Sequence, residues 1–98
     1  MSNSGPEPDV SAAGQRVLVI DDETVVGLSC KRILGQDRHD VQAFTDPEAG
    51  LRAALSGDFD VILLDLVMPG IGGLEILKKL DSTGVPSEVV VITGHSTV

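Results

Sequence analysis

The sequence has 98 residues, of which 42% are hydrophobic, and this composition is enough for the core of one small domain. Its 15 acidic and 7 basic side chains give a formal net charge of −8 at pH 7. Because such an excess of carboxylates repels phosphate backbones and anionic lipids, we expect this segment to bind neither nucleic acid nor membranes. The single cysteine, Cys30, excludes an internal disulfide.

Residues 1–15 are rich in Ser, Gly and Pro and offer little that a core could bury, so we expect a disordered tail before a folded domain at 16–98. This stretch lacks the basic start and apolar run of a signal peptide. The longest apolar runs elsewhere are too short to span a bilayer. Together with the lone cysteine, these features predict a cytoplasmic protein.

From residue 16 onward, short apolar runs alternate with amphipathic stretches, the pattern of β-α units around a parallel sheet. Aliphatic runs at 17–20, 61–64 and 89–92 predict buried strands, and residues 41–44 predict a weaker one. The stretches between these runs have apolar residues at helical spacing. The predicted order is therefore strand, helix, strand, helix, strand, helix, strand.

Each predicted helix has an identifiable apolar face or start signal. The first helix ends near Gly35 and has an apolar face of Val26, Cys30, Ile33 and Leu34. The second follows the capping sequence at 45–48, which places a proline in the first turn, and runs to about residue 55. The third has an apolar face of Leu74, Ile76, Leu77 and Leu80. Its expected cap, Gly72, supplies no side-chain acceptor.

Polar side chains follow three of the predicted strands at the point where each ends. Asp21 and Asp22 follow the first strand, Asp65 follows the third, and Thr93 follows the fourth. Ligands of open parallel sheets bind at the carboxyl ends of the strands, where these side chains would converge. Carboxylates forced together repel one another, and Mg²⁺ would relieve that repulsion while keeping positions open for a phosphoryl oxygen. An aspartate carboxylate can also accept a phosphoryl group as a nucleophile.

Taken singly, each of these residues has an ordinary explanation. An aspartate at a strand end is commonly a turn residue, and Thr93 alone would be an unremarkable strand residue. The sequence segments around these residues favour a shared function, because four such segments follow one another along the chain in the same order as in a known family. They are VLVIDDE at 17–23, VILLDLVMPG at 61–70, GLEIL at 73–77 and VVVITG at 89–94.

These segments resemble the receiver domain of bacterial two-component response regulators. The resemblance covers about residues 16–98, and the 43 residues from Asp22 to Asp65 and the 28 from Asp65 to Thr93 suit that family. It implies an α/β fold with a flavodoxin-like, doubly wound parallel sheet of strand order 2-1-3-4. The final helix, strand and helix of the receiver fold would be missing from this incomplete domain.

The resemblance also implies a function. Asp65 would be the phosphoacceptor of a Mg²⁺-dependent phosphorelay, with a sensor histidine kinase or a phosphotransfer protein as the donor. Asp21, Asp22, Asp65 and the backbone carbonyl of Val67 would hold Mg²⁺. Thr93 would be the switch hydroxyl that moves to the phosphoryl group. The module would be regulatory rather than an enzyme, although the family assists its own phosphorylation and dephosphorylation.

Residues near the acceptor and beyond the last strand refine this expectation. In the family, the positions of Val67 and His95 influence how long the phosphoaspartate survives, and the apolar Val67 cannot orient an attacking water. The family's phosphate-binding lysine and aromatic switch residue are missing from the 98 residues, so we expect impaired phosphoryl transfer. The edge running from Val89 to Ile92 would be exposed and prone to self-association.

Two other functions stay open at this point. A truncated or degenerate receiver would serve as an interaction or dimerisation module that does not need phosphorylation. A phosphatase of the haloacid-dehalogenase type also uses an aspartate at a strand end. That chemistry requires a second aspartate two residues further on, where this sequence has Val67.

Overall fold

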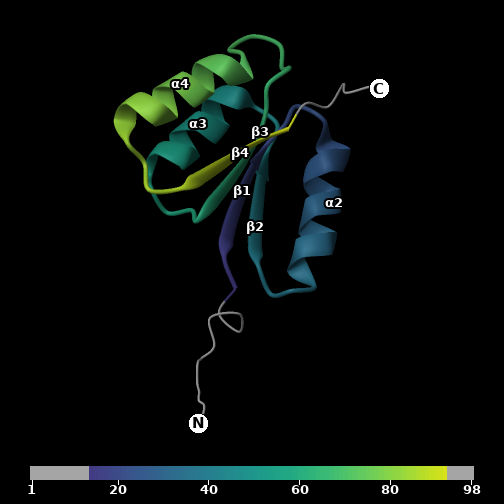
Figure 1. Cartoon of the computed structure of the whole chain (residues 1–98). Coiled ribbons are helices and arrows are strands. Elements are labelled where there is room, and N and C mark those ends of the chain that lie inside the picture. The colour runs from purple at the N-terminus through teal and green to yellow at the C-terminus, as the bar shows by residue number, and fades with distance from the viewer. Residues whose placement is uncertain (1–13, 93–98) are drawn as a thin grey trace.

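The computed structural model describes residues 14–92, which form a four-stranded parallel sheet with three helices (Figure 1). In chain order the elements are β1 (Arg16–Ile20), α2 (Thr24–Gly35), β2 (Asp40–Phe44), α3 (Pro47–Leu55), β3 (Val61–Asp65), α4 (Gly73–Thr83) and β4 (Glu88–Ile92). The strands lie in the order β2-β1-β3-β4, and every neighbouring pair is parallel. The predicted fold class and strand order are thereby confirmed.

The helices cover both faces of the sheet. Figure 1 shows α3 and α4 side by side on one face and α2 on the other. The larger core lies under α3 and α4, and its fully buried members are Leu18, Ile20, Ala54, Ile62, Leu64, Ile76 and Leu80. Val17 and Val19, the alternate residues of β1, are buried as well and point to the opposite face. Because β1 is covered on both faces, every side chain of its aliphatic run is buried, which explains why the run contains no polar residue.

The chain enters β1 through two residues that the sequence places in the tail. The backbone N–H of Gln15 donates to Nδ1 of His39 at 3.0 Å, and its carbonyl accepts from the N–H of Asp40 at 2.8 Å. Gly14 has φ of 69° and lies against the backbone carbonyl of Arg38, where a Cβ would not fit. Residues 14 and 15 are thus attached to the folded domain, and the rest of the predicted tail lies outside the described residues.

The apolar face predicted for the first helix is partly wrong. Ile33 of α2 is 59% exposed, and the residue that is buried against the sheet is Gly27. A Cβ on Gly27 would lie 2.6 Å from Cβ of Ala43 in β2, so the missing side chain lets α2 approach the sheet closely. A hydropathy pattern marks large apolar residues and does not detect a contact made by glycine.

The other two helices begin where the sequence predicts, but each differs from the prediction in one residue. In α3, Pro47 occupies the first turn, but Asp46 at the N-cap makes no side-chain capping hydrogen bond. In α4, Gly72 is the N-cap and provides no side-chain cap, as predicted. Leu74 was expected on the buried face of α4 but is 54% exposed.

No helix within residues 14–92 has both the length and the apolar character needed to cross a membrane.

The contact between Gly27 and Ala43 makes a testable prediction about how α2 is held. We expect Gly27→Ala to lower the free energy of unfolding by about 1–2 kcal/mol in urea titrations, because overpacking outweighs the gain in helix propensity. Ala43→Gly in the same chain should restore part of the loss, since it removes the atom that the new Cβ meets.

Gly35, at the end of the same helix, is the matched control. A Cβ at Gly35 meets nothing within 4 Å, so Gly35→Ala should leave stability unchanged or slightly raised. Equal stabilities of the Gly27→Ala and Gly35→Ala proteins would show that α2 is not held against β2 at this distance.

Candidate metal centre

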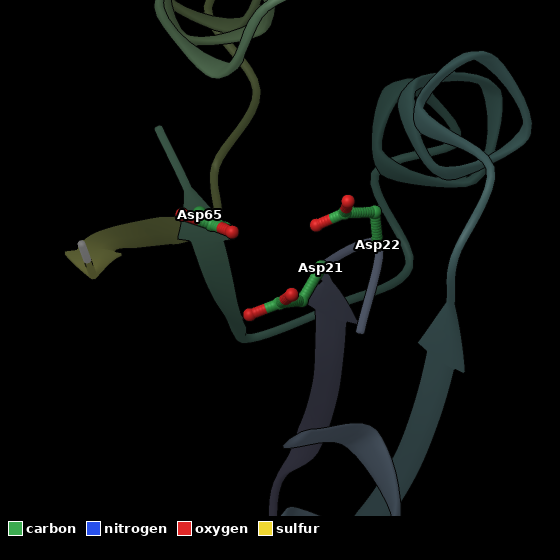
Figure 2. A group of neighbouring side chains, drawn as sticks. All are labelled: Asp21, Asp22 and Asp65. Atoms are coloured by element: carbon green, nitrogen blue, oxygen red, sulfur yellow. The ribbon is translucent and has the colours of Figure 1, made fainter. Parts of the chain in front are cut away.

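The register of the sheet brings three carboxylates to one edge. Ile20 of β1 is the partner of Leu64 of β3, so the next residues, Asp21 and Asp65, follow at adjoining positions. Carboxylate oxygens of Asp21, Asp22 and Asp65 lie within 4.8 Å of one another. Figure 2 shows the three side chains around a common space, with Asp22 reaching across toward Asp65. These side chains therefore converge as their positions after the strands predict.

Two of the three carboxylates are buried. Asp21 and Asp65 are each 4% exposed, whereas Asp22 is exposed to solvent. Oδ1 of Asp21 accepts the N–H of Glu23 at 2.9 Å, and Oδ1 of Asp65 accepts the N–H of Val67 at 3.0 Å. Within residues 14–92 these are the hydrogen bonds made by the two side chains. One oxygen of each buried carboxylate is thus left to bind another group.

The electrostatics of the cluster favour a cation. Burial raises the pKa of Asp21, and the neighbouring charges of Asp65, Asp22 and Glu23 raise it further, against the opposing effect of the hydrogen bond from the Glu23 N–H. None of the three carboxylates forms an ion pair with a basic side chain of the described part of the chain. A set of clustered carboxylate oxygens, with part of the sphere open to solvent, suits Mg²⁺. The residues present therefore fit the metal that the sequence predicts.

The loop after β3 fixes the position of Asp65. Met68 is 9% exposed and belongs to the main core, while Val67 beside it is 50% exposed. The N–H of Leu66 donates to the carbonyl of Ile92 at 3.1 Å, which ties this loop to β4. Gly73, the first residue of α4, lies against the backbone carbonyl of Asp65, where any Cβ would collide. The sequence places Gly73 at the start of the segment 73–77, but its contact with the Asp65 backbone was not predicted.

Two residues with predicted roles lie outside the described residues. They are Thr93 and His95, whose functions stay predictions. The metal ligation predicted for the backbone carbonyl of Val67 also stays a prediction. Ile92, the last described residue of β4, is the register partner of Asp65.

Comparison with known proteins agrees with this geometry. The chain belongs to the response regulator receiver domain family, whose model matches residues 17–98. It is 31% identical over 86 residues to the transcriptional regulatory protein TcrA of Mycobacterium tuberculosis, covering 88% of this chain and 34% of TcrA. It is 40% identical over 82 residues to the transcriptional regulatory protein FixJ of Azorhizobium caulinodans, covering 84% of this chain and 39% of FixJ. The chain thus spans about a third of the length of these curated relatives.

Solved receiver structures have the same fold. The response regulator TrrA of Thermotoga maritima, in complex with Mg²⁺–BeF, is 29% identical and superimposes with a TM-score of 0.76, covering 84% of this chain and 71% of TrrA. A structure of the histidine kinase ThkA in complex with TrrA matches with a TM-score of 0.75 and 29% identity, covering 85% of this chain and 72% of the matched chain.

The charge repulsion at the three aspartates makes a prediction about stability and pH. Asp21→Asn removes one charge and keeps an oxygen for the Glu23 N–H. In metal-free buffer at pH 7 we expect it to raise the free energy of unfolding by about 1 kcal/mol. The folded-state pKa of Asp21 is raised, so the wild type loses stability as the pH rises through that pKa. The difference between the two proteins should vanish below about pH 3, where Asp21 is protonated in both the folded and the unfolded state.

Added Mg²⁺ should reverse the order of stability. A ligand at 100 times its dissociation constant stabilises a folded protein by about 2.7 kcal/mol, so thermal unfolding of the wild type should shift upward as Mg²⁺ is titrated. The shift should be smaller in Asp21→Asn. Asp58→Asn, which changes an exposed carboxylate before β3, at the other end of the sheet, should respond like the wild type. Equal Mg²⁺ shifts in all three proteins would contradict a metal centre at Asp21.

Proposed function

We propose that this chain is the phosphoacceptor module of a two-component phosphorelay and that Asp65 carries the phosphoryl group. The observation that carries the proposal is the placement of Asp65 at the end of β3, buried, with Oδ1 held by the Val67 N–H and a carboxylate oxygen within 4.8 Å of those of Asp21 and Asp22. The chain belongs to the receiver domain family over residues 17–98, and the resemblance of the segment 61–70 to that family implies the acceptor role of Asp65.

The proposed reaction is a transfer of a phosphoryl group from a phosphohistidine to Asp65. A carboxylate oxygen of Asp65 attacks phosphorus, and the new P–O bond forms as the P–N bond breaks. The electron pair of the broken bond stays on the imidazole nitrogen, which takes a proton from water. Asp21, Asp22 and Asp65, with the carbonyl of Val67, would hold Mg²⁺, which when bound offsets the charge of the phosphoryl oxygens. Thr93 would contact the transferred group.

The proposed phosphoryl donor is a sensor histidine kinase or a phosphotransfer protein. Helix α2 begins two residues after Asp22, and its residues Val25 and Leu28 are 63% and 60% exposed. An exposed apolar surface next to the carboxylates gives a donor protein a place to pack while its histidine approaches Asp65. The ThkA–TrrA complex supports this class of partner, because TrrA has the same fold as this chain.

The module is regulatory, accepting one phosphoryl group per cycle instead of turning over a substrate, and it acts in the cytoplasm. Its net charge of −8 supports the absence of nucleic-acid and membrane binding by this segment. The edge of β4 that has no strand neighbour within residues 14–92 is proposed as a second contact surface, for another copy of the chain.

Phosphorylation with a small donor tests the proposed acceptor directly. Incubated with acetyl phosphate and Mg²⁺, the wild type should gain the mass of one phosphoryl group by intact mass spectrometry, and Asp65→Asn should gain none. Asp58→Asn, the matched control, should be labelled to the same extent as the wild type at equal times. Chelation of Mg²⁺ should abolish labelling in both. Labelling of Asp65→Asn, or a labelled peptide that lacks Asp65, would overturn the proposal.

A further inference from the structure

Gly73, the first residue of α4, is buried against the backbone that follows β3. A Cβ added to Gly73 would collide with the carbonyl oxygen of Asp65 and would lie 2.5 Å from Cα of Leu66. These neighbours are backbone atoms, so no side-chain rotation makes room. Gly73 is not among the glycines with positive φ, and its own backbone conformation would accept a side chain. The contact alone therefore requires glycine at this position.

The preceding residue, Gly72, shows that the requirement is specific to one position. Its backbone is extended, with φ of −79° and ψ of 158°, a conformation open to any residue. A Cβ on Gly72 would meet nothing within 4 Å. A side chain at residue 72 would thus extend into open space, whereas one at residue 73 would displace the chain around it.

Helix α4 is anchored in a way that prevents it from withdrawing from this contact. Ile76 and Leu80, on its inner face, are 0% and 2% exposed and belong to the main core. An outward movement of the helix large enough to admit a Cβ would open that core, which is close-packed. A side chain at residue 73 would therefore act mainly on the strand end below it.

The sheet leaves the peptide between Asp65 and Leu66 few directions in which to move. Asp65 is the register partner of Ile92 in β4, and the N–H of Leu66 donates to the carbonyl of Ile92 at 3.1 Å. These contacts resist movement within the plane of the sheet. Helix α4 covers one face of the sheet (Figure 1), so a Cβ on Gly73 would push the peptide out of that plane.

We propose that Gly73 is a positioning residue for the phosphoacceptor, an inference that rests on the proposed role of Asp65. Oδ1 of Asp65 accepts the N–H of Val67 at 3.0 Å, and the peptide that Gly73 contacts lies between these two groups along the chain. Displacing this peptide moves the nucleophile and the group that orients it together. A displacement of about 1 Å at a reacting group can lower the rate about 100-fold.

Gly73→Ala tests the proposal together with two matched variants. With acetyl phosphate and saturating Mg²⁺, Gly73→Ala should be labelled at least about tenfold more slowly than the wild type, as followed by intact mass spectrometry. Gly72→Ala adds the same methyl group one residue earlier and should be labelled at the wild-type rate. Val17→Ala removes buried apolar volume at the amino end of β1 and controls for a general loss of stability.

The amide resonance of Val67 provides a local readout that needs no phosphorylation. Its N–H is bonded to the Asp65 carboxylate, so the chemical shift of this proton reports where the carboxylate lies. In metal-free protein, Gly73→Ala should move this resonance, whereas Gly72→Ala and Val17→Ala should leave it unchanged. A wild type that accepts no phosphoryl group would refute the proposed function, and this resonance would still test the position of Asp65.

Hydrogen exchange of the β1 and β3 amides shows whether each variant is folded, and an excluded osmolyte such as trimethylamine N-oxide favours the folded state of a weakened one. Wild-type labelling and an unmoved Val67 resonance in Gly73→Ala would overturn the proposal. Equal slowing in folded Val17→Ala would do so too. A Gly73→Ala protein that stays unfolded in the osmolyte also overturns it, because the glycine would then serve the whole fold instead of the acceptor.

Discussion

The repulsion among Asp21, Asp22 and Asp65 is the interaction around which the rest of this fold is arranged. Asp21 and Asp65 follow adjacent strands in register, so the ladder between β1 and β3 holds the backbone of these two residues at neighbouring positions. Burial removes most of the water that would otherwise screen the charges of Asp21 and Asp65. The aliphatic core on both faces of β1 must therefore offset the repulsion between these carboxylates. A divalent cation bound among them would relieve that repulsion, and the free energy so gained would contribute to the affinity for the cation.

Close backbone contacts hold the site in place around that repulsion. Gly27 brings α2 against β2, and Gly73 brings the start of α4 against the carbonyl of Asp65. The hydrogen bond from the Val67 N–H orients one oxygen of Asp65, and the buried side chain of Met68 anchors the loop that follows. The carboxylate thus receives its position from backbone and core, and one of its oxygens remains available for chemistry.

Much of this architecture can be predicted from the sequence, because the strands and the site residues are marked by runs of a few adjacent residues. Aliphatic runs predicted the strands β1, β3 and β4, and the aspartates that follow β1 and β3 predicted the edge where the site lies. The prediction that residues 89–92 are buried is wrong for Val90 and Val91, which are 42% and 39% exposed. The prediction failed where glycine makes the contact: Ile33 and Leu74 have suitable hydropathy but are exposed. The contact of Gln15 with His39 joins residues distant in sequence through a backbone group, which leaves no hydropathy pattern to read.

Strand β4 lies beside the carboxylate cluster and is an edge strand among the strands of residues 14–92. Its last described residue, Ile92, is the register partner of Asp65, and its carbonyl accepts the N–H of Leu66, the residue that follows the acceptor. The backbone that follows Asp65 is therefore held by the end of β4, so the position of the carboxylate depends on the pairing of β3 with β4 as well as on the pairing of β3 with β1.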